Sequence, residues 1–198
     1  MIYLISQIIV LISFIISIAY GAVKVSRKTI LFCELVINIL YGTHNLLLGA
    51  TTGAVMNFIA LIVLVIYYYK GKNKVLSSNL IPLFAMLTFM TAGLLSWNNI
   101  YSLFPMIGAM LFALAMWFDS EKDIKVVVII LQVMWLLYAI SNNSIVAIIG
   151  QSFIVLSLTM YLILGDKYKK ITSSVNAWFR AKFGKKAKLD ATEPDNIV

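Results

Sequence analysis

A stripe of polar residues interrupts an apolar stretch near the start of the chain and offers the first candidates for chemistry. Glu34, Asn38, Tyr41 and Asn45 follow one another at spacings of four, three and four residues. On a helix, this spacing keeps them on one face, within roughly 60° of arc. In an apolar environment such groups usually face the interior of a helix bundle. A carboxylate, two amides and a phenol on one face predict either a solute-binding surface or a contact between helices.

The same residue types return later in the chain at a constant offset of 97 positions. The alignment runs without a gap from Lys28 over Lys125 to Lys72 over Lys169, with 11 identities in 45 positions. Apolar segments often match by chance, so the polar and glycine identities carry the argument. They are Tyr41 with Tyr138, Asn45 with Asn142, Gly53 with Gly150 and three pairs of lysines. A duplicated membrane unit of this size is typical of transporters, with a site where the halves meet. A duplicated scaffold without a pathway is the alternative.

The second copy of the stripe adds an indole and further amides. Trp135, Tyr138 and Asn142 lie on the equivalent face, with Gln132 beside them. Asn38 and Trp135 occupy matching positions, so we expect them to approach each other near the middle of the membrane, where an amide and an indole suit a small polar solute. The predicted pathway residues are Asn38, Asn57, Trp135, Tyr41, Tyr138, Asn45, Asn142, Gln132 and Gln151. For each, a hydrogen bond that only holds helices together, commonly worth about 0.6 kcal/mol, is the alternative.

Two titratable residues in the apolar segments have different expected roles. Glu34 is the only acidic residue within these segments, and no Lys or Arg lies within them to compensate it. Because an uncompensated charge at that depth is costly, we hypothesise that Glu34 binds a proton and couples transport to pH. His44, the only histidine, lies off the Glu34 face near the end of its segment. For His44 we expect a hydrogen bond at a helix end rather than a metal ligand or a proton relay.

The composition predicts a polytopic helical membrane protein. Of the 198 residues, 62% are hydrophobic and 12% are charged, against about a quarter in a soluble domain. The mean hydropathy is +0.95. A helix that spans the membrane needs about 20 mostly apolar residues. Seven such segments are expected, at 2–23, 29–48, 52–69, 78–96, 100–118, 126–140 and 144–165.

The basic residues fix the expected orientation of these seven spans. All 16 Lys and Arg residues lie in segments 24–28, 70–74, 119–125 and after 165, which are alternate loops. Since cytoplasmic loops are enriched in Lys and Arg, this pattern predicts an outer N-terminus and an inner C-terminus. The formal net charge of +8 is then explained by inner loops rather than by nucleic-acid binding.

The repeat and the spans together predict a 3+1+3 architecture with parallel repeats. The first repeat covers residues 1–72, the fourth span at 73–97 is a linker that restores the orientation, and the second repeat covers 98–169. Residues 170–198 form a cytoplasmic tail. Its start is expected to be a basic amphipathic segment on anionic inner-leaflet lipids, or alternatively a solvated basic tail, and its end is expected to be disordered.

No motif for an enzyme, a cofactor or a metal site is present. The sequence has no Gly-rich phosphate loop, no paired histidines and no nucleophile elbow. Its single cysteine, Cys33, excludes an intramolecular disulfide and a cysteine-based metal site. We therefore expect neither an enzyme nor a cofactor-binding protein.

One run of residues resembles a known family. Gly42, His44, Leu47, Leu48 and Gly49, followed by Ala54 and Asn57, are similar to the uncharacterised bacterial inner-membrane proteins of the YgjV type, over about the first 165 residues. The architecture also looks like that of the SWEET sugar facilitators and the PnuC-type vitamin transporters. In SWEET proteins, an Asn pair and a Trp pair line the pocket. Here Asn57 pairs with Ile154 in the repeat register, and Trp135 pairs with Asn38.

The resemblance implies a multi-pass protein of the bacterial cytoplasmic membrane. We expect it to move a small polar solute, sugar-like or vitamin-like, by alternating access. A non-transporting scaffold or regulatory protein with the same fold is the alternative.

Overall fold

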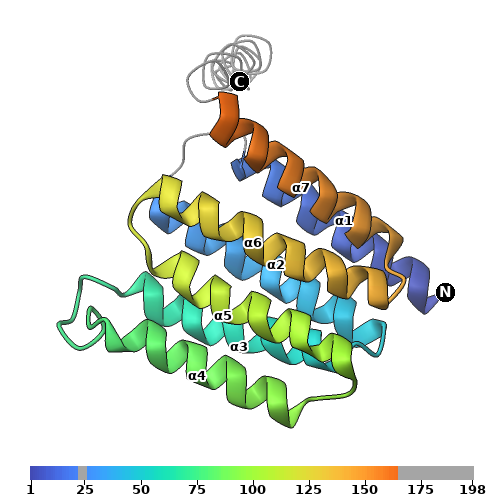
Figure 1. The fold of residues 1–198 in the computed structure, drawn as a ribbon, viewed down its shortest axis with the longest axis horizontal. Helices are drawn as coiled ribbons and strands as arrows, with labels where there is room; N and C mark the ends of the chain where they lie inside the picture. Colours follow the sequence, from blue (N-terminus) through green and yellow to red (C-terminus); the bar gives the residue numbers. More distant parts are fainter. Residues whose placement is uncertain (22–25, 165–198) are drawn as a thin grey trace, which may run out of the picture. The chain divides into compact units, whose positions relative to one another are not determined.

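Seven α-helices and one short 3-10 helix make up the part of the chain described by the computed structural model, residues 1–21 and 26–164 (Figure 1). The predicted tail at 170–198 lies outside the described residues. Chain contacts divide the protein into two units, Met1–Thr159 and Met160–Val198, and the helix bundle up to Thr159 makes up the first unit. The elements are α1 (Ile2–Gly21), α2 (Arg27–Leu47), α3 (Thr51–Tyr68), α4 (Leu80–Leu95), η1 (Ile100–Ser102), α5 (Leu103–Trp117), α6 (Glu121–Ser141) and α7 (Ile145–Leu164).

Four of these helices are long and apolar enough to cross a membrane: α2, α3, the continuous η1–α5 segment and α6. Three shorter apolar segments lie in α1, α4 and α7. At 1.5 Å per residue, the 16 residues of α4 extend about 24 Å, somewhat less than the hydrocarbon core of a typical bilayer. Large apolar side chains such as Ile15, Phe84 and Phe153 are exposed on the outward faces of the helices, as is typical of lipid-facing surfaces.

The helices form two rows that face each other. In one row α1 packs on α2 and α2 packs on α3, and in the other α5 packs on α6. The rows meet where α3 packs on α5, and α4 contacts both of these helices. In Figure 1, α6 overlaps α2 and α7 overlaps α1, and the side chain of Gln7 in α1 accepts a hydrogen bond from the Val146 backbone N–H of α7. Members of both polar stripes are buried among these helices: Asn38 and Asn45 of α2, and Tyr138 of α6.

The helix ends follow local capping signals, and one predicted boundary is wrong. Segment 119–125 is not wholly a loop, because α6 begins at Glu121. The Ser120 side chain accepts a hydrogen bond from the Asp123 backbone N–H, so this serine starts the helix five residues earlier than hydropathy alone indicates. The turn between α2 and α3 needs Gly49, whose φ of 70° is in the left-handed region that glycine adopts without strain.

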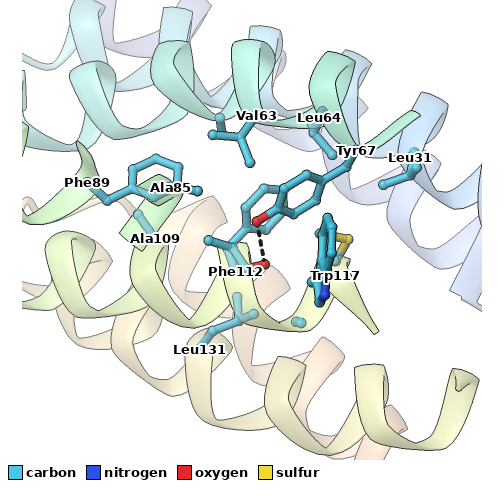
Figure 2. Close-up of a cluster of buried hydrophobic side chains, with 14 of the residues drawn as sticks. Leu31, Val63, Leu64, Tyr67, Ala85, Phe89, Ala109, Phe112, Trp117 and Leu131 are labelled. Atoms are coloured by element: carbon cyan, nitrogen blue, oxygen red, sulfur yellow. Dashed lines mark hydrogen bonds between the residues drawn. The ribbon is translucent and has the colours of Figure 1, made fainter. Parts of the chain in front are cut away.

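A large apolar cluster holds α3, α4 and α5 together (Figure 2). Tyr67 is fully buried in it, and its hydroxyl donates to the carbonyl oxygen of Ala113 at 3.0 Å. Between membrane helices, association relies on van der Waals packing, and small residues allow backbones to approach closely. Ala60, Ala109 and Ala113 serve this role here, since each is nearly fully buried. This tight contact fixes α3 relative to α5 and so supports the space beside it.

The charged side chains of three helix ends gather at one end of the bundle. Arg27 donates to the carbonyl oxygens of Tyr67 and Met116, at 3.3 and 3.0 Å, in the last turns of α3 and α5. Lys70 donates to the carbonyl oxygen of Trp117 at 2.7 Å, and both cations approach Asp119. Cations near helix C-termini are stabilised by the free carbonyl groups and the helix dipole. The basic loops predicted to share one side of the membrane therefore meet in space.

Candidate functional site

A cavity in the middle of the bundle brings together seven of the ten residues singled out from the sequence. Its volume is about 50 Å³, and α2, α3, α5, α6 and α7 all contribute to its wall. At roughly 10–15 Å³ per water on this measure, it has room for a few water molecules or one small polar group. The predicted residues in its wall are Glu34, Asn38, Tyr41, Asn57, Gln132, Trp135 and Gln151. Glu34 lines the same cavity as Asn38.

Two asparagines in this wall make hydrogen bonds within their own helices. The Asn38 amide nitrogen donates to the carbonyl oxygen of Glu34 at 2.7 Å, and that of Asn57 donates to the carbonyl oxygen of Gly53 at 2.7 Å. Both bonds connect residues four positions apart, so neither ties one helix to another. These contacts do not explain why amides are placed in the interior, since alanine would leave the helix intact.

The two glutamines in the wall leave acceptors unsatisfied. Gln151 is 4% exposed, and its Nε2 donates to the Tyr41 hydroxyl at 3.1 Å. Its Oε1 has no hydrogen-bond partner, and the same is true of the buried Oε1 of Gln132. Buried polar groups are nearly always satisfied, so two orphan oxygens in one cavity indicate a place for a bound donor.

Trp135 forms the aromatic side of the cavity because a glycine makes room for it. A Cβ on Gly108 would lie 3.1 Å from the indole nitrogen of Trp135. The Trp135 ring also packs at 6.1 Å and nearly perpendicular to Tyr138 on the same helix. The indole therefore borders both the central cavity and the next space along the bundle.

A second and narrower cavity continues from the first and holds the remaining predicted residues. It has a volume of about 10 Å³, roughly one water molecule, and shares Tyr41, Trp135 and Gln151 with the central cavity. Asn45, Tyr138 and Asn142 line it as well. The Tyr138 hydroxyl accepts a hydrogen bond from the Gly53 backbone N–H at 3.1 Å, which joins α6 to α3 across this section.

A third cavity opens where the loops opposite the charged end lie. Its volume is about 40 Å³, and it shares Tyr138 and Asn142 with the narrow section. Its wall is mostly polar and includes Thr52, Asn98 and Asn99. The three cavities thus lie in series, with the smallest in the middle, and all nine predicted pathway residues line at least one of them. That these residues conduct a solute stays a prediction.

His44 lies in a hydrogen-bond network at this same end, as expected for a residue at a helix end. Its Nδ1 donates to the carbonyl oxygen of Ser6 at 2.8 Å, so its Nε2 accepts from the Ser144 hydroxyl at 3.0 Å. Gln7 accepts from the Val146 backbone N–H at 3.0 Å. These bonds tie α1 and α2 to α7, and they account for His44 and Gln7 as structural residues.

A family comparison identifies the class of protein to which this arrangement belongs. The model of the Imp-YgjV family, described as a bacterial inner membrane protein, matches residues 4–166. The chain belongs to this family. As an Imp-YgjV protein it resides in the bacterial inner membrane, in agreement with its apolar helices. No significant match was found among curated proteins or among solved structures.

Sequence reasoning missed the apolar part of the cavity wall in this Imp-YgjV protein. Ile37, Met56, Phe112 and Leu131 line the central cavity among the polar groups. Nothing distinguishes these side chains from the many other apolar residues of the spans. Gly108, which lies against the Trp135 indole, is likewise one of several small residues in the spans, and nothing in the sequence distinguishes it from the others.

Proposed function

We propose that this protein moves a small polar solute across the inner membrane by alternating access. The observation that carries the proposal is the series of cavities, in which two larger spaces are separated by a section of about 10 Å³. Alternating access requires a midplane site that is closed toward one side at a time. Polar side chains continue through the narrow section, which would be an unexplained cost in a bundle that serves only assembly.

The proposed architecture is 3+1+3, with seven spans, an outer N-terminus and an inner C-terminus. Gly53 and Gly150 are equivalent positions of the two repeats, and each contacts a residue of the other repeat, which supports this architecture. Gly53 contacts Tyr138, a residue of the second repeat, and Gly150 contacts Phe14 of the first. Next to Gly150, Gln151 bonds to Tyr41, which is the repeat equivalent of Tyr138. Each half thus meets the other at matching positions around the narrow section, where small rotations of one half against the other would open or close it.

The proposed role of Glu34 is to couple this movement to a proton gradient. The carboxyl group borders the central cavity within the same wall as Asn38 and Gln132, so its charge state acts directly on any solute there. Glu34→Gln is expected to remove the pH dependence of uptake, while solute exchange itself persists with a lowered affinity for the solute. Uptake by proteoliposomes measured between pH 5.5 and 8 tests this role, and a Gln variant with a wild-type pH response would exclude it.

Uptake of a panel of small polar solutes by purified protein in liposomes tests the proposal. Trp135→Ala is expected to abolish uptake of the transported solute, because the indole borders both the central cavity and the narrow section. Trp97→Ala is the matched control, since Trp97 is exposed in the loop between α4 and η1 and lines none of the three cavities. Equal uptake by protein-free and protein-containing liposomes across the panel would favour the scaffold or regulatory role instead.

A further inference from the structure

Most of the amide groups in the wall of the central cavity already use their nitrogens for hydrogen bonds within the protein. The NH₂ groups of Asn38 and Asn57 donate to backbone carbonyl oxygens, which can only accept. This requirement fixes the orientation of both amides and leaves the side-chain oxygen as the free end. Gln151 uses its Nε2 for the Tyr41 hydroxyl in the same way. The side-chain nitrogens of three of the four amides in the wall therefore already donate a hydrogen bond within the protein.

Two of the wall oxygens are buried acceptors without any partner. They are Oε1 of Gln132 and Oε1 of Gln151, and Gln151 is only 4% exposed to solvent. A buried acceptor that lacks a donor bears the full cost of losing its water. Such a cost is expected where a ligand supplies the missing donor. The complementary ligand carries N–H or O–H groups that point at two glutamine oxygens.

The charges and rings around the cavity indicate that this ligand is positive. Glu34 places a carboxyl group in the wall, and no Lys, Arg or His is among the described residues that line the cavity. The cations Arg27 and Lys70 are held at the end of the bundle by backbone carbonyls and Asp119. Trp135 and Phe112 add aromatic faces, which attract cations through the ring quadrupole. An anion would face the Glu34 carboxyl group and two amide oxygens without a donor here.

We propose that the central cavity binds a small organic cation that carries N–H donors, of the primary ammonium or guanidinium class. This inference rests on the proposed transport function and names the class of its solute. The N–H groups satisfy the oxygens of Gln132 and Gln151, the Glu34 carboxylate compensates the charge, and the indole of Trp135 covers the apolar part. The space of about 50 Å³ fits a compact cationic group of this kind.

Calorimetric binding to the purified full chain in lipid nanodiscs tests the ligand class, with guanidinium chloride as the probe. Urea has the same planar shape and N–H donors without the charge, and tetramethylammonium has the charge without the donors. Guanidinium is expected to bind at least about tenfold more tightly than either, since hydrogen bonds that involve a charged group are the stronger ones. Binding of urea or tetramethylammonium as tight as that of guanidinium, or tighter binding of acetate, would overturn the proposal.

Variants locate the bound probe. Gln132→Leu, Gln151→Leu and Glu34→Gln are each expected to weaken guanidinium binding about ten- to a hundredfold. Thr88→Val is the matched control and should bind as the wild type does, because Thr88 is an exposed residue of α4 that bonds only to the Phe84 carbonyl oxygen. Thermal unfolding of every variant shows that it is folded. Unchanged affinity in all three cavity variants would contradict this location.

Different results would contradict the two proposals, solute transport and cation binding in the central cavity. Guanidinium binding that depends on Gln132 and Gln151, without uptake of any solute by proteoliposomes, would leave this site standing and remove the transport function. Uptake of neutral or anionic solutes that depends on Trp135, without guanidinium binding, would leave transport standing and overturn the cation site.

Discussion

At the scale of single residues, the cavity side chains divide into those that hold the fold and those that do not. Tyr138 and His44 each bond to another helix, so they have a structural role. Asn38 and Asn57 bond only within their own helices, and Gln132 leaves an acceptor unpaired. Buried polar residues that lower stability and form no hydrogen bond between helices are expected at functional sites, where activity requires groups that packing does not favour.

Replacing Gln132 by leucine is expected to raise stability. The change removes a buried acceptor without a partner, whose cost is about 1–3 kcal/mol, and keeps a similar volume. Thermal unfolding in detergent should show a higher melting temperature than that of the wild type. Tyr138→Leu is the contrasting variant and should be less stable than the wild type, because it leaves the Gly53 N–H without a hydrogen-bond acceptor. A marked loss of stability in Gln132→Leu would show that the glutamine is a packing residue.

Replacing either cavity asparagine is expected to affect transport without affecting stability. Asn38→Ala and Asn57→Ala should abolish transport and leave the melting temperature near the wild-type value, because no bond between helices is lost. Thr43→Ala is a matched control for both, since Thr43 also bonds four residues back, to Ile39, and lines none of the three cavities. Solute uptake and thermal unfolding are measured on the same preparations. A parallel fall of stability and uptake would assign the asparagines to packing.

At the scale of elements, the contact of α3 with α6 depends on the absence of a side chain at Gly53. A Cβ at this position would lie 2.5 Å from the Tyr138 ring. Gly53→Ala is therefore expected to destabilise the protein by about 1–3 kcal/mol, as overpacking typically does. Gly42→Ala is a milder control, since its Cβ would meet the half-exposed ring of Phe58 at 3.0 Å. Gly53→Ala should cost less stability in a Tyr138→Ala background than in the wild type, and additive losses would contradict a direct clash.

The charged end of the bundle joins α2 to α3 and α5 mainly through carbonyl oxygens. Asp119 is 74% exposed, so its ion pairs with Arg27 and Lys70 contribute about 0–1 kcal/mol. Arg27 itself is three-quarters buried and bonds to the ends of two helices. Arg27→Ala should therefore cost clearly more stability than Asp119→Ala. Thermal unfolding at low and high salt checks this order, and a larger loss in Asp119→Ala would reverse it.

At the scale of the whole molecule, the proposed orientation in the membrane predicts which loops are reached from outside the cell. Thr51, the first residue of α3, and the loop residues Asn98 and Asn143 are exposed at the end opposite the charged cluster, whereas Lys72 lies next to that cluster. Cysteines at the first three positions are expected to react with an impermeant reagent added outside intact cells, and Lys72→Cys is not. The native Cys33 is replaced by serine in every variant. Labelling of Lys72→Cys in intact cells would invert the proposed topology.

The sequence by itself determined the helices, their membrane character and the residues worth testing. Hydropathy placed the helices to within a few residues, except at α6, where the Ser120 cap overrides the charges that follow it. The helical spacing of the stripe from Glu34 to Asn45 predicted a common face, since a helix relates residues three and four apart. The family assignment expected from residues such as His44 and Gly49 is confirmed.

Only the tertiary structure decided how these faces combine into cavities. Gln151 donates a hydrogen bond to the Tyr41 hydroxyl and leaves its own side-chain oxygen without a partner. Both features depend on distances between α2 and α7, which no local sequence pattern encodes. The same holds for the apolar wall at Met56 and Phe112, since most positions in a membrane helix are apolar whether they face lipid, a neighbour or a cavity. Spacing along one helix selects a face, but what that face meets is set by the packing of all the others.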